Sequence, residues 1–387
     1  MMIDTMQRLE SGRAAYTNGR LLLPDREVWG TLIVENGRIA DIGEGLFRGG
    51  VDVGGAICMP GLVELHTDNI ETVLAPRPGV RWPLELAAHY HDRSIIAAGI
   101  TTVCDAIALG DTLPGSSRLE YYAPIIEVIA RGAAAGRYAS DHRIHLRCEL
   151  VYDELVEVVA RFIDEPLVVL LSVMDHTPGQ RQFADLDKFE QYYGGRYGLD
   201  RAGIARVMED RLRAQERHAA SNRDRVVAMA RERSIPLATH DDALPEHIAE
   251  AVREGAAIAE FPTTAQAARA ARESGLHVLM GAPNVVLGGS QSGNVSALAL
   301  AASGLVDIFS SDYVPQSLLQ VPFALAAATR APLYETVRSV TSTPARAIGL
   351  TDRGTLEIGK RADLLFVDVD RDQPRICGVV SAGVRVA

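Results

Sequence analysis

Eight short apolar runs constrain the fold of this 387-residue chain more than any other feature of its sequence. Helical stretches separate most of these runs, which is typical of a parallel sheet whose strands are joined by crossover helices. Eight strands in this arrangement favour an α/β fold of the closed (β/α)₈ TIM-barrel type over an open doubly wound sheet. The predicted strands are Met59–His66, Thr101–Ala106, Arg143–Leu150, Pro166–Asp175, Pro236–His240, Ala256–Phe261, His277–Gly281 and Asp307–Asp312.

The two ends of the chain have a different pattern, in which short β-rich runs are interrupted by glycine. Such runs occur between residues 16 and 57, and again in the segments RGTLEIGKRADLLFVDVD and ICGVVSAGVRVA near the C-terminus. Both ends are therefore predicted to form strands and turns outside the alternating α/β region.

Charge and composition exclude several classes of protein. The formal net charge of −11 argues against a general nucleic-acid binder. The sequence has no run of about 20 apolar residues that would span a membrane, and its N-terminus lacks the pattern of a signal peptide. The four cysteines lie far apart without a CxxC pair, which favours free thiols and a cytoplasmic location. We expect a small-molecule substrate, no nucleic-acid or membrane partner, and an oligomeric state that stays open between monomer and homo-oligomer.

Six of the predicted strands end in an ionisable residue, in the segments GLVELHTD, TTVCDA, HLRCEL, LLSVMDH, IPLATHDD and DIFSSD. The carboxyl ends of barrel strands converge on one face, so these side chains can meet although they are far apart in sequence. Imidazole and carboxylate groups together suit Zn, Mn or Fe. The candidate metal ligands are His66, Asp68, Glu149, His176, His240 and Asp312.

Each candidate ligand also has a simpler structural explanation. A single histidine at a strand end is often a hydrogen-bonded structural residue, an aspartate there often caps the next helix, and Glu149 could pair with Arg143 or Arg147. The whole set favours a metal site, because burying such groups unpaired costs on the order of several kcal/mol each. The remaining histidines are expected to be surface or structural residues: His89, His91, His142, His145, His218, His247 and His277.

Several longer segments resemble the amidohydrolase superfamily. They are MPGLVELHTDNIE, PRPGVRWP, AAGITTVCDA, SVMDHTPGQRQF, ATHDDA, IAEFPTT, MGAPNVVLGGSQSGNVSA and SSDYVPQSLL. Together they resemble a diphosphatase family of the carbon–phosphorus lyase pathway, over nearly the whole chain. The ending TPARAIGLTDRGTLEIGKRADLLFVD is shared more broadly among amidohydrolases. The resemblance implies a catalytic barrel of residues 59–351 and a small β-sandwich composed of residues 1–58 and 352–387.

The resemblance assigns roles to some of the candidate ligands. The superfamily's first-strand His-x-His motif corresponds to His66-Thr67-Asp68, its fifth-strand histidine to His240, and its eighth-strand aspartate to Asp312. The sixth-strand position, where relatives often have histidine, falls in AEFPTT and contains none.

Other positions depart from the superfamily pattern. Many relatives bridge two metals with a carboxylated lysine, but Lys188 lies in a polar loop and Lys360 near the C-terminus. A carboxylate such as Glu149 must take this role, or the site holds fewer metals, and His176 would fill a remaining position. Relatives usually have a histidine where this chain has Gln291 in the GGSQSGN segment.

The resemblance implies hydrolysis of a ribosyl 1-methylphosphonate 5-triphosphate to the 5-phosphate and pyrophosphate. The expected cofactor is a divalent metal, Zn first, with Mn or Fe as alternatives, and one or two ions. Asp312 is the candidate general base, and Asp242 is a candidate for orienting water or a metal ligand.

A triphosphate also requires cationic and hydrogen-bond donors. The candidates are the arginines Arg77, Arg81 and Arg181 in predicted loops, and Ser290, Ser292 and Asn294 in the GGSQSGN segment. The sequence has no GxxxxGK[ST] motif, so a P-loop is not the phosphate binder.

Two other functions stay open from the sequence. One is a different amidohydrolase chemistry on the same metal frame: a deaminase, a cyclic amidase or an N-acetyl-sugar deacetylase. The other is a non-catalytic metal-binding subunit of a pathway complex. Serine or cysteine nucleophilic catalysis is disfavoured, because the chain lacks GxSxG and its cysteines lie within apolar runs.

Overall fold

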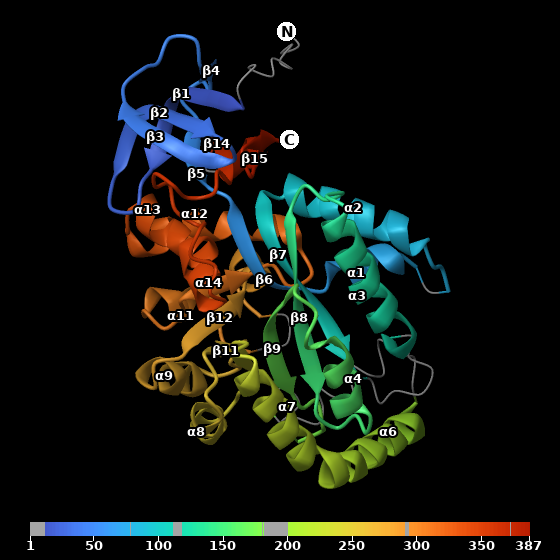
Figure 1. Cartoon of the computed structure of the whole chain (residues 1–387). Helices are drawn as coiled ribbons and strands as arrows, with labels where there is room; N and C mark the ends of the chain where they lie inside the picture. Colours follow the sequence, from blue (N-terminus) through green and yellow to red (C-terminus); the bar gives the residue numbers. More distant parts are fainter. Residues whose placement is uncertain are drawn as a thin grey trace.

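The structure is a computed structural model, which describes residues 12–77, 79–110, 118–179, 181, 200–290, 294–371 and 373–387. Eight parallel strands follow one another around a barrel in chain order, and a bridge between Thr67 and Asp312 links the last strand back to the first (Figure 1). The TIM-barrel prediction is confirmed. The barrel strands are β6 (Leu62–Thr67), β7 (Ile100–Leu109), β8 (Asp141–Glu149), β9 (Val168–Met174), β10 (Leu237–His240), β11 (Ile258–Glu260), β12 (His277–Gly281) and β13 (Ile308–Ser310).

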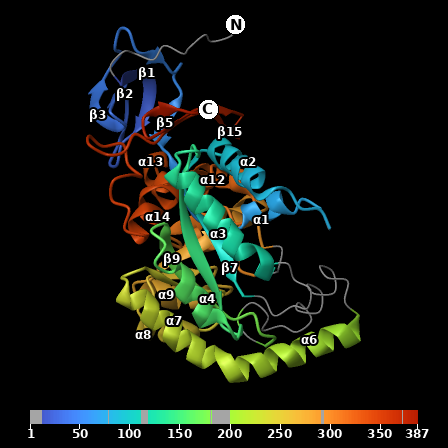
Figure 2. The same ribbon diagram turned by 45° about the vertical axis from the view of Figure 1, so that its right-hand side comes forward.

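Helices cover the outside of the barrel. Within the described residues they are α1 (Asn69–Leu74), α2 (Leu84–Ala97), α3 (Arg118–Ala134), α4 (Leu155–Phe162), α6 (Arg201–Ala214), α7 (Ala220–Glu232), α8 (Pro245–Glu254), α9 (Ala265–Glu273), α10 (Ala282–Val286), α11 (Ala297–Ala302), α12 (Gln320–Thr329), α13 (Leu333–Thr336) and α14 (Ser342–Ala347). A short π-helical segment, Gln215–Ala219, joins α6 to α7, so that the two form one long bent rod beside the barrel (Figure 2). None of the described helices combines the length and apolarity needed to cross a bilayer.

Strands from both chain ends form a second sheet, in the order β16-β15-β14-β5-β1-β2-β3, with β4 paired to β1. The blue N-terminal strands and red C-terminal strands lie together at one end of the barrel in Figures 1 and 2. The β domain predicted from both termini is thereby confirmed, and its boundaries at residues 58 and 352 stay a prediction. Its strands are β1 (Arg13–Leu22), β2 (Glu27–Glu35), β3 (Arg38–Glu44), β4 (Val51–Asp52), β5 (Ile57–Pro60), β14 (Leu364–Asp370), β15 (Gln373–Ser381) and β16 (Val384–Arg385).

The predicted strand Met59–His66 is divided between the two sheets, which corrects the sequence analysis. Its first residues belong to β5 in the terminal sheet, and the barrel strand β6 begins at Leu62. Gly61 marks the crossing, where an added Cβ would meet Thr101 Oγ1 at 2.1 Å. Only glycine leaves room for this close approach of chain to strand.

Alternation along β8 separates a helix-facing side from a barrel-facing side. Ile144, Leu146 and Cys148 pack in an apolar cluster with residues of α3 and α4. On the other side, His145 Nδ1 bonds Leu65 O of β6 at 3.1 Å and His145 Nε2 bonds Ser172 Oγ of β9 at 2.9 Å. Since β6 is not adjacent to β8, this side chain reaches across the barrel interior. By the two-residue period of a strand, His145, Arg147 and Glu149 therefore share the interior face.

A buried polar cluster lies on the helix-facing side, between β7, β8 and α2. Asp105 accepts hydrogen bonds from His91 Nε2 at 2.6 Å and from His142 Nδ1 at 2.7 Å. His142 Nε2 also lies 3.4 Å from Asp92 Oδ1, and Asn69 Nδ2 donates to His91 Nδ1 at 3.2 Å. The cluster thus connects α2 to the residue after Asp68, which agrees with the structural role predicted for His91 and His142.

His142→Gln is expected to destabilise the fold in a pH-dependent way. Burial acts to lower the pKa of His142, but Asp105 and Asp92 outweigh it and raise the pKa to about 9. A raised histidine pKa stabilises the folded state fully below the unfolded value near 6.5, and this stabilisation is lost as the pH rises through about 9. The free energy of unfolding should fall by about 3 kcal/mol near pH 6, because a buried ion pair is broken.

Urea denaturation at several pH values between 6 and 10 measures this effect. The difference in the free energy of unfolding between wild type and His142→Gln should become smaller as the pH rises toward 10. His89→Gln, at an exposed position on α2, is the control. A gap that does not change with pH would refute the charged state of His142.

Candidate metal centre

Two histidines and one glutamate form the centre of the candidate site. His66 is the last residue but one of β6 and His240 ends β10, and their rings are stacked with centroids 5.7 Å apart. Glu260, at the end of β11, accepts a hydrogen bond from Nδ1 of each histidine at 2.7 Å. With both Nδ1 atoms protonated, each Nε2 carries the lone pair that binds a metal.

Glu260 was missed in the sequence analysis. The segment AEFPTT was noted there only because it lacks a histidine. The signal was present, since Glu260 is an acidic residue at the end of an apolar barrel strand, and its side chain is fully buried. A carboxylate at this depth is stable because both of its oxygens accept hydrogen bonds.

Asp312 lies beside His66 through backbone contacts. Its N–H donates to His66 O at 3.1 Å, and its carbonyl accepts from Thr67 Oγ1 at 2.7 Å and from Asp68 N–H at 3.3 Å. Burial raises the pKa of Asp312 to about 6, with Asp68 adding to the increase while His66 opposes it. The closure of the barrel between β13 and β6 thus brings a carboxyl group of raised pKa next to the imidazole pair.

Asp68 occupies the N-cap position of α1 but makes no side-chain capping bond. The helix-capping explanation considered for an aspartate after a strand therefore does not apply to it. Its carboxylate remains as a potential ligand next to His66, as expected from the His-Thr-Asp segment.

A second group of donors adjoins the first. His176 Nδ1 bonds Glu149 Oε2 at 2.6 Å, so Glu149 pairs with this histidine and not with Arg143 or Arg147. Burial acts to raise the pKa of Glu149, but His176 outweighs it and holds the pKa at about 2. Asp241 Oδ2 lies 3.3 Å from His240 Nε2 and 3.8 Å from His176 Nε2. His240 thereby belongs to both groups.

The donor sets fit a divalent metal. His66, His240 and Glu260 present potential ligand atoms within 4.8 Å of one another, and His176, His240 and Asp241 do the same. Imidazole nitrogens and carboxylate oxygens in this mixture suit Zn, Mn or Fe. Five of the six predicted ligands are brought together by these contacts, and the sixth, Asp68, lies directly after β6. Asp241, which the sequence analysis passed over for Asp242, is an additional candidate from the THDD segment.

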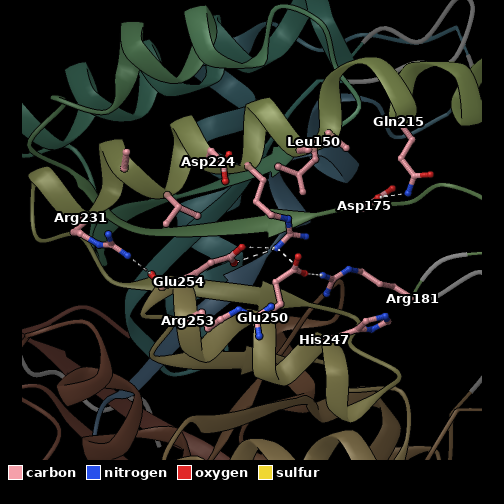
Figure 3. A pocket seen from close by; sticks show the side chains of 15 residues that line it. Leu150, Asp175, Arg181, Gln215, Asp224, Arg231, His247, Glu250, Arg253 and Glu254 are labelled. Carbon is pink, nitrogen blue, oxygen red and sulfur yellow. Dashed lines mark hydrogen bonds and ion pairs between the residues drawn. The ribbon is translucent and has the colours of Figure 1, made fainter.

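Asp242 and Arg181 form a buried ion pair with each other. Arg181 donates to Asp242 Oδ1, and also lies 3.3 Å from Glu250 Oε2 on α8. Figure 3 shows Arg181 reaching toward Glu250 at a pocket of about 730 Å³ between α7 and α8. The phosphate-binding role of Arg181 and the water-orienting role of Asp242 stay predictions. In the structure each of these side chains has the other as its partner.

The other candidate substrate-binding residues lie in more open surroundings. Arg77 and Arg81 are exposed and follow α1, the helix that begins directly after Asp68. The Arg81 guanidinium lies 5.2 Å from the centroid of the Tyr121 ring. Ser290 and Asn294 are half-buried, whereas Ser292, Gln291 and Lys188 lie outside the described residues.

Comparisons with known proteins agree with this architecture. The model of a family described as "Amidohydrolase family" matches residues 93–387. Alpha-D-ribose 1-methylphosphonate 5-triphosphate diphosphatase of Escherichia coli (strain K12) is 44% identical over 373 residues, which cover 95% of this chain and 99% of that protein.

Two solved structures share the fold at low sequence identity. A 5-methylcytosine deaminase from Klebsiella pneumoniae is 16% identical with a TM-score of 0.64, covering 96% of this chain and 98% of its own. An N-acetyl-D-glucosamine-6-phosphate deacetylase from Mycobacterium smegmatis is 16% identical with a TM-score of 0.63, covering 97% of this chain and 99% of its own. From the barrel with histidines and carboxylates at its strand ends, and from these matches, it follows that the chain belongs to the amidohydrolase family.

Proposed function

We propose that this chain hydrolyses α-D-ribose 1-methylphosphonate 5-triphosphate to the 5-phosphate and pyrophosphate. The observation that carries the proposal is the 44% identity, over 95% of the chain, to an enzyme of that name. The deaminase and deacetylase neighbours are 16% identical, which supports only a common fold. The His66 and His240 rings, both hydrogen-bonded to Glu260, offer the nitrogen ligands for the divalent metal that such a hydrolase needs.

The proposed cofactor is Zn, with Mn or Fe as alternatives, in one or two sites. One site would be formed by His66, His240, Asp68 and Asp312, and a second by His176, Glu149 and Asp241 near the shared His240. When bound, a divalent metal lowers the pKa of a coordinated water and polarises a phosphoryl oxygen. A cytoplasmic location and assembly into a homo-oligomer remain predictions.

The chain's own residues position the reactants and move one proton. Glu260 fixes the orientation of both imidazoles through its two carboxylate oxygens. The Asp312 carboxylate, whose pKa burial raises to about 6, accepts a proton from the attacking water. The water oxygen bonds to the α-phosphorus, and the bond from this phosphorus to the bridging oxygen breaks. Pyrophosphate leaves with the electron pair, and the ribosyl 5-phosphate remains.

The leaving pyrophosphate requires cationic partners near the open face. Arg77 and Arg81 are exposed and follow α1, the helix that comes after β6 in the chain. Ser290 and Asn294 offer further hydrogen-bond donors. These residues are proposed to bind the β- and γ-phosphates, whose contacts are made in the ground state as well as in the transition state.

Arg81→Ala is expected to raise KM about tenfold and to lower kcat less, because a hydrogen bond to a charged group contributes about 1.5–3 kcal/mol. Initial rates of pyrophosphate release over a range of substrate concentrations measure both constants. Arg131→Ala, at an exposed position on α3, serves as the control. An unchanged KM in Arg81→Ala would remove this residue from the substrate site.

A coupled assay with a panel of compounds tests the proposed function. Pyrophosphate release from the ribosyl triphosphate should be fast, and ammonia or acetate release from nucleobases, cyclic amides and N-acetyl sugars should be absent. Treatment with a chelator should abolish the activity, and divalent metal should restore it. Turnover of an amide, with none of the triphosphate, would instead favour the alternative amidohydrolase chemistry. Bound metal without any turnover would favour a non-catalytic subunit.

A further inference from the structure

Arg147 is a buried arginine that forms no ion pair with any described residue. The residue is only 9% exposed, and its Nε has no hydrogen-bond partner. The hydrogen bonds and ion pairs of the described chain include none from its guanidinium group. The other three buried arginines differ in this respect: Arg181 pairs with Asp242 and Glu250, and Arg353 pairs with Asp141 and Asp352. The third, Arg211, donates a hydrogen bond to His176 O at 3.0 Å.

The position of Arg147 on β8 directs it into the barrel. It lies between His145, which bonds across the interior to β6, and Glu149, which bonds His176 of the candidate metal centre. The pKa values of His66 and Asp312 are both raised on balance, and the charge of Arg147 opposes each increase, behind larger effects of burial and of nearer charged groups. A guanidinium group therefore lies near the two residues that are proposed to hold metal and accept the proton.

The Arg147 guanidinium is expected to bind an anion from outside the chain. A buried cation without a counter-charge is unfavourable, and so is a cation close to a second cation. A divalent metal at His66 would place two positive groups on one interior space. A phosphoryl group between them would satisfy both, because its oxygens can bind a metal and accept paired hydrogen bonds from a guanidinium.

We propose that Arg147 binds the α-phosphoryl group of the triphosphate and stabilises the charge that develops on it during attack by water. This proposal rests on the proposed function, since it identifies which phosphate the interior arginine contacts. The exposed Arg77 and Arg81 then bind the departing phosphates, and Arg147 acts at the phosphorus that water attacks.

Arg147→Gln and Arg147→Lys test the proposal against Arg143→Lys. Arg143 lies at the other end of the same strand and pairs with Asp141 at 2.9 Å, so it is a matched control. Removing one preorganised donor for transition-state charge typically lowers kcat by about 10²–10³-fold. We expect this loss in Arg147→Gln, with a smaller change in KM, a partial loss in Arg147→Lys and wild-type rates in Arg143→Lys.

Two further measurements separate this role from a structural one. Metal content by elemental analysis should match wild type in both Arg147 variants, and thermal unfolding should show a folded protein. Isothermal titration with inorganic phosphate should show binding to wild type that is at least tenfold weaker in Arg147→Gln. Should Arg147→Gln fail to fold, Arg147→Lys gives the same readouts with the charge retained.

The outcomes decide the two claims separately. A kcat within threefold of wild type in metal-loaded Arg147→Gln would overturn the proposal, as would equal phosphate affinity in the two proteins. If wild type releases no pyrophosphate, the proposed function fails. The titration with inorganic phosphate then still decides whether Arg147 is an anion receptor.

Discussion

Replacing Asp312 with asparagine is expected to lower kcat for pyrophosphate release by about 10³-fold, because general-base catalysis contributes about 10²–10⁴-fold. Asp312 is half-buried and is bonded to His66 through its backbone, and an amide of the same shape as its carboxylate cannot accept the proton of the attacking water. Most of the metal should remain bound, because the asparagine side chain keeps a carbonyl oxygen at this position and the imidazole pair and Glu260 are untouched. Steady-state rates measure the fall in kcat, and elemental analysis of the same preparation measures the metal that remains bound.

The backbone at position 312 makes this variant informative. Asp312 has a φ of 55°, a left-handed conformation that asparagine tolerates as well as aspartate. Asp307→Asn provides a control before the opposite end of β13, where Asp307 pairs with Arg272 at 2.6 Å. Wild-type rates in Asp312→Asn would refute its assignment as the base.

His66→Ala and His240→Ala are expected to lose most of the bound metal together with activity. Each removes one Nε2 donor from the centre and also leaves one oxygen of Glu260 without its partner. Loss of even an outer partner of a metal ligand typically weakens metal affinity by about 10–100-fold, and loss of a direct ligand should exceed this. Metal-to-protein ratios after dialysis against metal-free buffer measure the effect.

An exposed histidine provides the control for this pair. His89 lies on α2 and its side chain is exposed, so His89→Ala should retain the wild-type ratio. Unchanged metal occupancy in both His66→Ala and His240→Ala would show that the metal, if any, binds elsewhere in the chain.

The barrel could be predicted from sequence because its signals are local. Each strand is a short apolar run, and the polar residue that ends it is adjacent in sequence. This is why His66, Glu149, His176, His240 and Asp312 could be expected at one face before any coordinates. Their convergence is a property of the barrel itself and not of any single residue.

The features that escaped prediction depend on contacts between distant segments. The division of Met59–His66 follows from Gly61 packing against Thr101, which is 40 positions away. The pairing of Arg181 with Asp242 spans 61 positions and removes both charges from the surface. Nothing local to either residue indicates such a partner.

Glu260 and Arg147 were not predicted as site residues for a different reason. Both lie in strands that were predicted. The predicted strand Ala256–Phe261 ends in an apolar residue, one position after Glu260, and Arg147 lies three positions before the predicted end of its strand at Leu150. Alternation along HLRCEL would have placed Arg147 on the same face as Glu149. What sequence could not show is that none of the described carboxylates pairs with Arg147, because that depends on every strand around the barrel.

The most direct test of the central claim follows oxygen from water into the products. Metal-loaded protein would hydrolyse α-D-ribose 1-methylphosphonate 5-triphosphate in H₂¹⁸O, and ³¹P NMR would locate the isotope shift. The account predicts pyrophosphate without label and one ¹⁸O on the ribosyl 5-phosphate, since water attacks the α-phosphorus held between Arg147 and the imidazole pair. Label in pyrophosphate, or no hydrolysis by metal-loaded protein, would contradict it.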